Sequence, residues 1–194
     1  ASQIQGHLGK HSSNGKPKRV PFSEEFLEEN SQKGIFIRGM SISIEELYKK
    51  SLSANPHLDI FGDAWFIRER FATEKRVDSA WYFIQKMVNP ASLNKPYDEA
   101  KNLLGIDEGI PEAHEIFYIA LSYYLIYHKH LFKGYYPFSQ NVFMGNRLLV
   151  GFFSKKLNGP LNQLDVRHYA GVLKSENIGI VSVKKAINLP KSSV

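Results

Sequence analysis

An apolar run from Ile116 to Tyr127, interrupted only by Ser122, sets the strongest constraint on how this chain folds. A helix that crosses a bilayer needs about 20 apolar residues, so the run is too short to span a membrane and indicates a buried helix. Pro111 lies just upstream, a residue common at the start of a helix. We therefore expect the longest helix of the chain at Glu112 to about Phe132, apolar almost all round and central to the core.

Upstream of this run the sequence favours helices, with one strand among them. Ser23 is the predicted N-cap of a short acidic helix, and Ser43 with Glu46 forms a capping box at the start of another. Residues 64–75, 78–88 and 96–104 also show helical signals, whereas the partly β-branched stretch 34–42 predicts a strand.

After Gly134 the pattern changes to three strand-like runs separated by turn residues, namely Arg147–Phe153, Leu164–Tyr169 and Ile178–Val183. Helices come first and strands last, without the alternation of a parallel sheet. The predicted fold class is α+β, with a helix-rich N-terminal two thirds around one long apolar central helix and a C-terminal antiparallel β-meander.

The positive charge of the chain lies at its two ends. The 194 residues carry a formal charge of +6 and a pI near 9.3, but residues 1–20 carry +4 and residues 181–194 carry +3, which leaves −1 for the stretch between them. We expect a basic flexible tail at 1–20, a single α+β domain at 21–187 and a short C-terminal tail at 188–194. A nucleic-acid partner would contact the ends of the chain, at Lys10, Lys16, Lys18, Arg19, Lys184 and Lys185. The alternative is that the N-terminal charges only keep the protein in solution.

Cysteine is absent, which excludes disulfides, thiolate zinc sites and cysteine nucleophiles. This composition favours a reducing compartment, and the first residues lack the apolar run of a signal peptide, so we expect a cytoplasmic protein. Phosphate-binding glycine motifs, the nucleophile elbow of serine hydrolases and the metal-dependent nuclease pattern are all incomplete. We predict no metal and no cofactor.

The densest polar neighbourhood runs from His57 to Asp63. Histidine and aspartate side chains in a loop can supply acid and base groups or bind a cation, which makes His57, Asp59 and Asp63 the catalytic candidates. The alternative interpretation is that Asp63 caps a helix and the other polar residues are solvated.

Aromatic residues are frequent, with 13 Phe, 10 Tyr and 2 Trp, and four of them crowd the stretch from Phe132 to Phe138. If this stretch is exposed, Tyr135 and Tyr136 are candidates for binding a partner, whereas burial would make it part of the core.

Three functions remain open for this sequence. The leading expectation is a soluble, non-catalytic interaction or accessory module, with a protein partner or a homo-oligomer, because every strong catalytic motif is incomplete. The alternatives are a nucleic-acid-associated protein that uses its basic ends, and a hydrolase or metal-dependent nuclease of unfamiliar architecture. Whether the chain is an enzyme stays open, and the incomplete catalytic motifs favour a protein that is not one.

Overall fold

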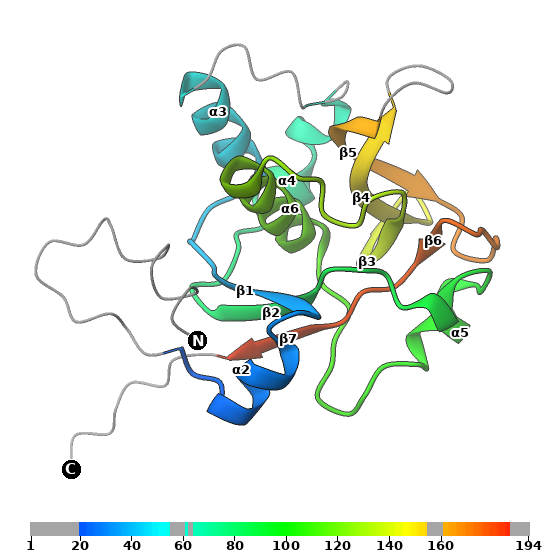
Figure 1. Cartoon of the computed structure of the whole chain (residues 1–194). Helices are drawn as coiled ribbons and strands as arrows, with labels where there is room; N and C mark the ends of the chain where they lie inside the picture. Colours follow the sequence, from blue (N-terminus) through cyan, green and yellow to red (C-terminus); the bar gives the residue numbers. More distant parts are fainter. Residues whose placement is uncertain (1–19, 55–60, 62–63, 155–160, 187–194) are drawn as a thin grey trace, which may run out of the picture.

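The structure is a computed structural model that describes residues 20–54, 61, 64–154 and 161–186. Within these residues the chain forms five α-helices and two β-sheets of seven strands in all (Figure 1). The helices are α2 (Glu24–Asn30), α3 (Ile44–Ala54), α4 (Arg70–Thr73), α5 (Tyr97–Lys101) and α6 (Ala113–Tyr127), with 3-10 turns at Trp65–Arg68 and Pro90–Ser92.

The first sheet is antiparallel and has the strand order β1-β2-β7. Strand β2 (Trp81–Gln85) lies in the middle, between β1 (Gly34–Arg38) and β7 (Val183–Ala186). In the register of the β1–β2 pair, Gly34 lies opposite Gln85 and Arg38 lies opposite Trp81.

The second sheet has the order β5-β4-β3-β6. Strands β3 (Tyr136–Phe143), β4 (Asn146–Ser154) and β5 (Leu161–Tyr169) run antiparallel to one another, and the short β6 (Ile178–Gly179) lies parallel to β3. The chain leaves the second sheet at β6 and enters the first at β7, so its last described strands tie the two sheets together.

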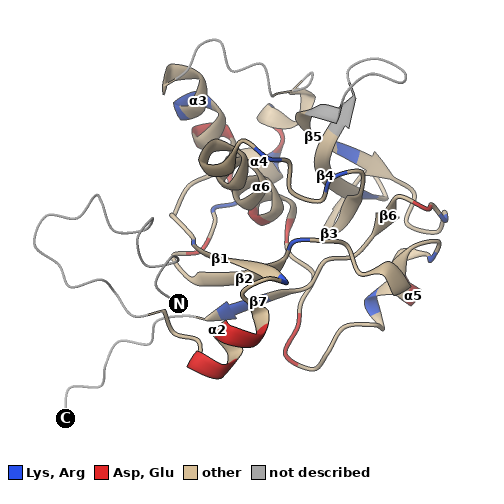
Figure 2. Ribbon diagram, in the orientation of Figure 1, with Lys and Arg blue, Asp and Glu red and all other residues tan. Residues whose placement is uncertain are grey.

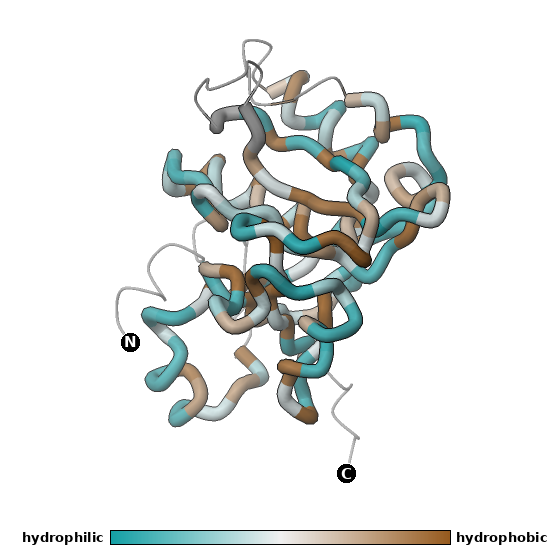
Figure 3. The backbone as a smooth tube through the Cα atoms, turned by 90° about the vertical axis from the view of Figure 1, so that its right-hand side faces the viewer, coloured by the Kyte–Doolittle hydropathy of each residue, from teal (hydrophilic) through white to brown (hydrophobic). Residues whose placement is uncertain are grey.

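Helices cover both faces of the first sheet (Figure 1). On one face, Phe26 of α2 lies 5.1 Å from Phe83 of β2, measured between ring centroids. On the other face, Tyr82 of β2 reaches Glu115 of α6. The main core packs around the first half of α6, whose Ile116 and Phe117 are fully buried. Figure 3 shows strongly hydrophobic stretches of the chain within this interior, with mostly hydrophilic residues in the outer loops.

The prediction of a helix over residues 78–88 is wrong, because residues 81–85 form strand β2. The first four residues of this strand are buried, since the sheet is covered on both faces. A strand covered on both faces is apolar at successive positions, and over a short stretch this pattern also fits the stripe of a buried helix.

The prediction of one long central helix is also wrong. Helix α6 is buried in its first half, but it ends at Tyr127, short of the predicted Phe132. His128 ends it with a left-handed backbone at φ 52°, a conformation that cannot continue a right-handed helix. Strands are spread along the chain and do not follow a helical N-terminal part.

The C-terminal meander is correct only for the two runs that form β4 and β5, which pair antiparallel. Strand β3, which pairs with the other edge of β4, was not among the predicted strands. The predicted strand Ile178–Val183 is two separate strands, because β6 pairs with β3 in parallel and β7 pairs with β2 in the other sheet. By contrast, the predicted N-cap at Ser23 and the capping box of Ser43 with Glu46 are confirmed by their hydrogen bonds.

No helix in the described ranges is long and apolar enough to cross a membrane. The terminal tails predicted at 1–20 and 188–194 lie outside the described residues apart from Val20, and the single domain at 21–187 stays a prediction.

Candidate functional site

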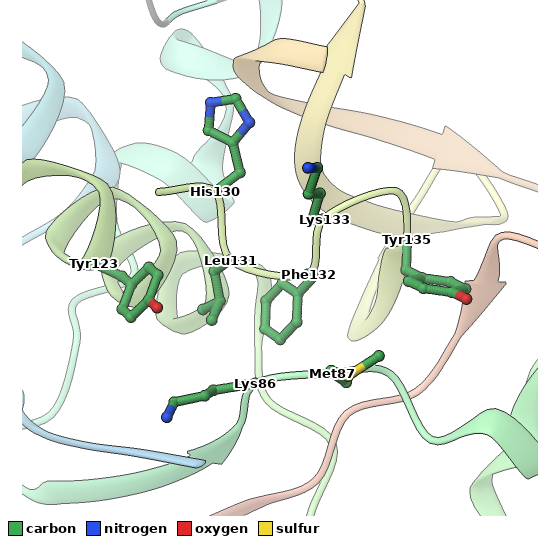
Figure 4. Close-up of a pocket in the computed structure, with 8 residues that line it drawn as sticks. All are labelled: Lys86, Met87, Tyr123, His130, Leu131, Phe132, Lys133 and Tyr135. Atoms are coloured by element: carbon green, nitrogen blue, oxygen red, sulfur yellow. The ribbon is translucent and has the colours of Figure 1, made fainter. Parts of the chain in front are cut away.

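A small hollow opens where the C-terminal end of α6, the end of β2 and the segment after α6 meet (Figure 4). Its volume is about 190 Å³. We call it the Tyr135 pocket. In Figure 4, Leu131 and Phe132 face Lys86 and Met87 across the hollow, with Tyr123 at one end and Tyr135 at the other. Its lining residues are Lys86, Met87, Tyr123, His130, Leu131, Phe132, Lys133 and Tyr135.

The segment that follows α6 and carries much of the pocket wall contains three residues with left-handed backbone. His128 has φ 52°, Phe132 has φ 56° and Gly134 has φ 81°. A left-handed conformation costs an L-residue roughly 1–2 kcal/mol, and it is an outlier for a bulky side chain such as phenylalanine. These turns carry the chain from α6 toward β3 and place Leu131 and Phe132, both buried, at the base of the hollow.

His130 is fixed to the pocket wall by stacking. Its ring lies 4.1 Å from that of Phe152, nearly parallel to it, and 5.5 Å from that of Tyr124. Burial lowers the pKa of His130, and the nearby positive charge of Lys133 lowers it further. The lowered pKa favours the neutral imidazole, which stacks on Phe152 and Tyr124.

Exposed apolar side chains surround the opening. Met87 lines the pocket and is 61% exposed. On α6, the ring of Tyr123 packs against that of Tyr127 at a tilt, with 4.8 Å between their centroids, and Ile126 and Tyr127 are about half exposed. Residues three and four apart share one face of a helix, so Ile126 and Tyr127 extend the apolar surface from Tyr123 along α6.

The charge at the pocket is positive. Among the described residues that line it, Lys86 and Lys133 are charged and none is a carboxylate. The ammonium of Lys86 donates a hydrogen bond to the backbone oxygen of Gln32 at 3.3 Å, which holds it at the edge of the hollow. Lys133 is exposed.

A second polar cluster, the Glu115 network, lies at the opposite end of α6. Glu115 is buried, and its Oε1 accepts hydrogen bonds from Lys185 Nζ at 2.5 Å and from Tyr82 Oη at 3.2 Å. Its Oε2 accepts the backbone N–H of Glu112 at 2.9 Å, and Asp78 lies 3.5 Å from Lys185. Both oxygens of the buried carboxylate therefore have hydrogen-bond partners, which is typical of a polar group that stabilises the fold.

The network shifts the titration of its members. Burial raises the pKa of Tyr82, and the negative charges of Glu115 and Asp78 raise it further. For Lys185, burial alone would lower the pKa, but the hydrogen bond and charge of Glu115, aided by Asp78, outweigh it and the pKa is raised. Next to the network, burial lowers the pKa of His114 against the opposing charges of Glu115 and Glu112.

A polar hollow of about 370 Å³ borders the Glu115 network. Four carboxylates and Lys185 line it, the carboxylates being those of Asp107, Glu108, Glu112 and Glu115. Acidic side chains therefore gather at the N-terminal end of α6, an arrangement that suits the dipole of the helix. In the described ranges, no group of three or more histidine or carboxylate side chains is placed to hold a metal ion.

The predicted site residues fall into separate places. Tyr135 lines the pocket, whereas Tyr136 is half buried against the smaller core cluster. Lys185 belongs to the Glu115 network, and Lys184 lies over the ring of Phe26 at 5.2 Å. The other candidates lie outside the described residues: His57, Asp59, Asp63, Lys10, Lys16, Lys18 and Arg19.

Sequence reasoning missed Lys86, Met87 and Tyr123 as pocket residues. Lys86 and Met87 fall in the stretch wrongly assigned to a helix, and Tyr123 was assigned to the core along with the rest of its apolar run. The one available signal was the aromatic stretch that follows α6. Comparison with protein-family models, with curated proteins and with solved structures finds no match for this chain.

Proposed function

We propose that this chain is a non-catalytic protein-interaction module and that its binding face is the Tyr135 pocket with the apolar surface around it. The observation that carries the proposal is the exposure of Met87, Ile126 and Tyr127 beside an aromatic-walled hollow. Large apolar side chains exposed together, with a pocket among them, are typical of surfaces that bind another protein.

The size of the pocket supports a side chain as its occupant. Sites for small molecules usually enclose about 300–1,000 Å³, and the Tyr135 pocket encloses about 190 Å³. This volume equals about six water molecules at roughly 30 Å³ each. A hollow of this size suits one large apolar side chain that anchors a partner.

The backbone of the wall supports the same proposal. Phe132 keeps a left-handed conformation that glycine would adopt without strain, and it does so directly at the pocket. Strained backbone is concentrated at functional sites, where the surrounding structure maintains it. The strain at Phe132 places the buried ring that closes the base of the hollow.

Protein is favoured over nucleic acid as the partner. Interfaces for nucleic acid are polar and strongly positive, whereas this face is largely apolar and has Lys86 and Lys133 at its edge. Of the basic residues predicted to contact nucleic acid, Lys185 is engaged by Glu115. Nucleic acid is the competing class of partner, and binding of single-stranded RNA at the pocket is the outcome that would favour it.

The test is a selection of linear peptides from a random library against the full chain, followed by affinity measurements on two variants. Met87→Glu places a charge in the pocket, and Met144→Glu is the matched control on the β3–β4 turn, where Met144 is 85% exposed. We expect the selected peptides to bind Met87→Glu at least tenfold more weakly and Met144→Glu unchanged.

Two outcomes would overturn the proposed function. One is that no peptide is enriched, or that the enriched peptides bind both variants equally. The other is that single-stranded RNA binds with a strong dependence on salt and competes with the selected peptides for the pocket. Nucleic acid would then be the partner in place of protein.

A further inference from the structure

The loop before α6 presents an isoleucine to solvent. Ile106 is 103% exposed, so none of its side chain is covered by the described residues. It lies at the tip of residues Gly105–Glu108, which we call the Ile106 loop and which protrudes from the lower edge of the molecule between α5 and α6 (Figure 1). Asp107 follows it directly, and Figure 2 shows this stretch as acidic.

The Ile106 loop is held in one conformation by its own hydrogen bonds. Glu108 Oε2 accepts the backbone N–H of Gly105 at 3.0 Å, and the backbone N–H of Glu108 donates to Gly105 O at 3.1 Å. Glu108 Oε1 accepts the hydroxyl of Ser182 at 2.9 Å, which fixes the loop to the segment before β7. A loop fixed in this way loses little conformational entropy when it binds a partner.

The loop and the Tyr135 pocket are complementary in shape and charge. The pocket has room for about one large apolar side chain, and Ile106 is one that is already exposed. Asp107 beside it would meet the lysines at the edge of the pocket, Lys86 and Lys133.

Other exposed apolar tips in the described part of the chain lack this charge. Val172 and Leu173 are exposed but precede Lys174, which the lysines of the pocket would repel. Met144 is followed by Gly145 and Asn146, and it has no carboxylate within two residues along the chain. Among these tips the Ile106 loop alone combines a large apolar side chain with an adjacent acid.

One molecule cannot make this contact with itself. The Ile106 loop lies before the first turn of α6, whereas the pocket lies at the C-terminal end of the helix. A helix of 15 residues is about 22 Å long at 1.5 Å per residue. The contact must therefore join two copies of the chain.

We propose that the Ile106 loop of one copy inserts into the Tyr135 pocket of a second copy, with Ile106 in the hollow and Asp107 beside the lysines. The proposal rests on the proposed function, because it names the partner of the same binding face. The two surfaces differ, so each copy offers a free loop and a free pocket, and the copies join head to tail into rings or open chains. One loop in one pocket buries less surface than a standard stable interface, so assembly depends on protein concentration.

The test measures the weight-average mass of the full chain by analytical ultracentrifugation over a series of concentrations. Ile106→Lys disables the loop and Met87→Glu disables the pocket, so each variant alone is expected to stay monomeric at concentrations where the unmodified chain assembles. An equimolar mixture keeps one working pocket and one working loop, so its mass should rise to that of two copies and stop there. Val172→Lys is the control, since it changes another exposed tip and should assemble like the unmodified chain.

The mixing experiment separates this inference from the proposed function. A full chain that stays monomeric at every concentration, a mixture that stays monomeric, or assembly that survives both variants would overturn head-to-tail association. If the full chain stays monomeric while selected peptides still bind through Met87, the partner is another protein and the proposed function stands. If the peptides also fail, both proposals are wrong.

Discussion

Lys185 on β7 and Glu115 on α6 form an ion pair with 2.5 Å between Nζ and Oε1, and Tyr82 on β2 donates to the same oxygen. The pair joins the last described strand to the buried helix at the core of the fold. The side chain of Glu115 is only 2% exposed, whereas that of Lys185 is 34% exposed. Water can therefore solvate the lysine if the pair is broken, but it cannot solvate the carboxylate.

Removing the lysine leaves a buried carboxylate without its counterion. Breaking a fully buried pair costs about 3–5 kcal/mol, and solvent around the partly exposed lysine reduces this. We expect Lys185→Ala to lower the free energy of unfolding by about 2 kcal/mol, measured by urea denaturation. Lys174→Ala, on an exposed loop, should change it by less than about 0.5 kcal/mol. Equal effects of the two substitutions would show that the pair does not stabilise the fold.

The Glu115 network predicts a loss of stability at alkaline pH. The folded state raises the pKa of both Lys185 and Tyr82, so as pH rises the unfolded chain releases these protons first. Their contribution is complete below the ordinary pKa values of about 10 for Tyr and 10.4 for Lys, and is lost above them. We expect the free energy of unfolding to fall as the pH rises above about 10, and to fall less steeply in Tyr82→Phe. Identical slopes would contradict this assignment.

The left-handed residue that ends α6 offers a substitution that should stabilise the protein. His128 has φ 52° and is exposed, and glycine adopts this conformation without strain. We expect His128→Gly to stabilise the protein by about 1 kcal/mol. Lys129→Gly is the control: Lys129 does not have a positive φ, so the substitution should destabilise the protein by making the unfolded chain more flexible. Thermal unfolding measures both, and a lower melting temperature for His128→Gly would contradict the prediction.

The parallel strand β6 packs too closely for a side chain at Gly179. A Cβ there would lie 2.4 Å from Ser92 Oγ and 2.5 Å from Val88 Cγ1. Ser92 Oγ also accepts the N–H of Ile180 at 3.0 Å, so it cannot move freely. Overpacking of this kind costs about 1–3 kcal/mol, which is the loss we expect for Gly179→Ala in urea denaturation. Gly109→Ala is the control, because the nearest atom to a Cβ there is 3.9 Å away. Equal losses would rule out close packing as the cause.

Local signals in the sequence predicted local structure well. Ser23 and Ser43 cap helices as expected, and the runs around β4 and β5 are antiparallel neighbours. The stretch 78–88 was misassigned because its apolar spacing fits a helix, whereas residues 81–85 form a strand that pairs with β1 and β7 and is covered by helices on both faces. A single sequence does not reveal that packing.

The candidate site shows the same limit. The aromatic stretch drew attention to Tyr135, which lines the pocket. Met87 and Tyr123 are brought to the same pocket by contacts between distant parts of the chain, as are the members of the Glu115 network on β2, α6 and β7. Charge counting also placed Lys185 among residues available to a polyanion, whereas the fold engages it with a buried carboxylate.

The most direct test of the binding face uses the three methionines of the chain, which are Met40, Met87 and Met144. All three are at least 60% exposed, and Met87 alone of the three lines the pocket. We would record the ¹³C-methyl NMR spectrum of methionine-labelled full chain while adding a selected peptide. The proposed function predicts that the Met87 signal shifts in proportion to binding while Met40 and Met144 stay in place. A Met87 signal that does not move at saturating peptide would contradict it.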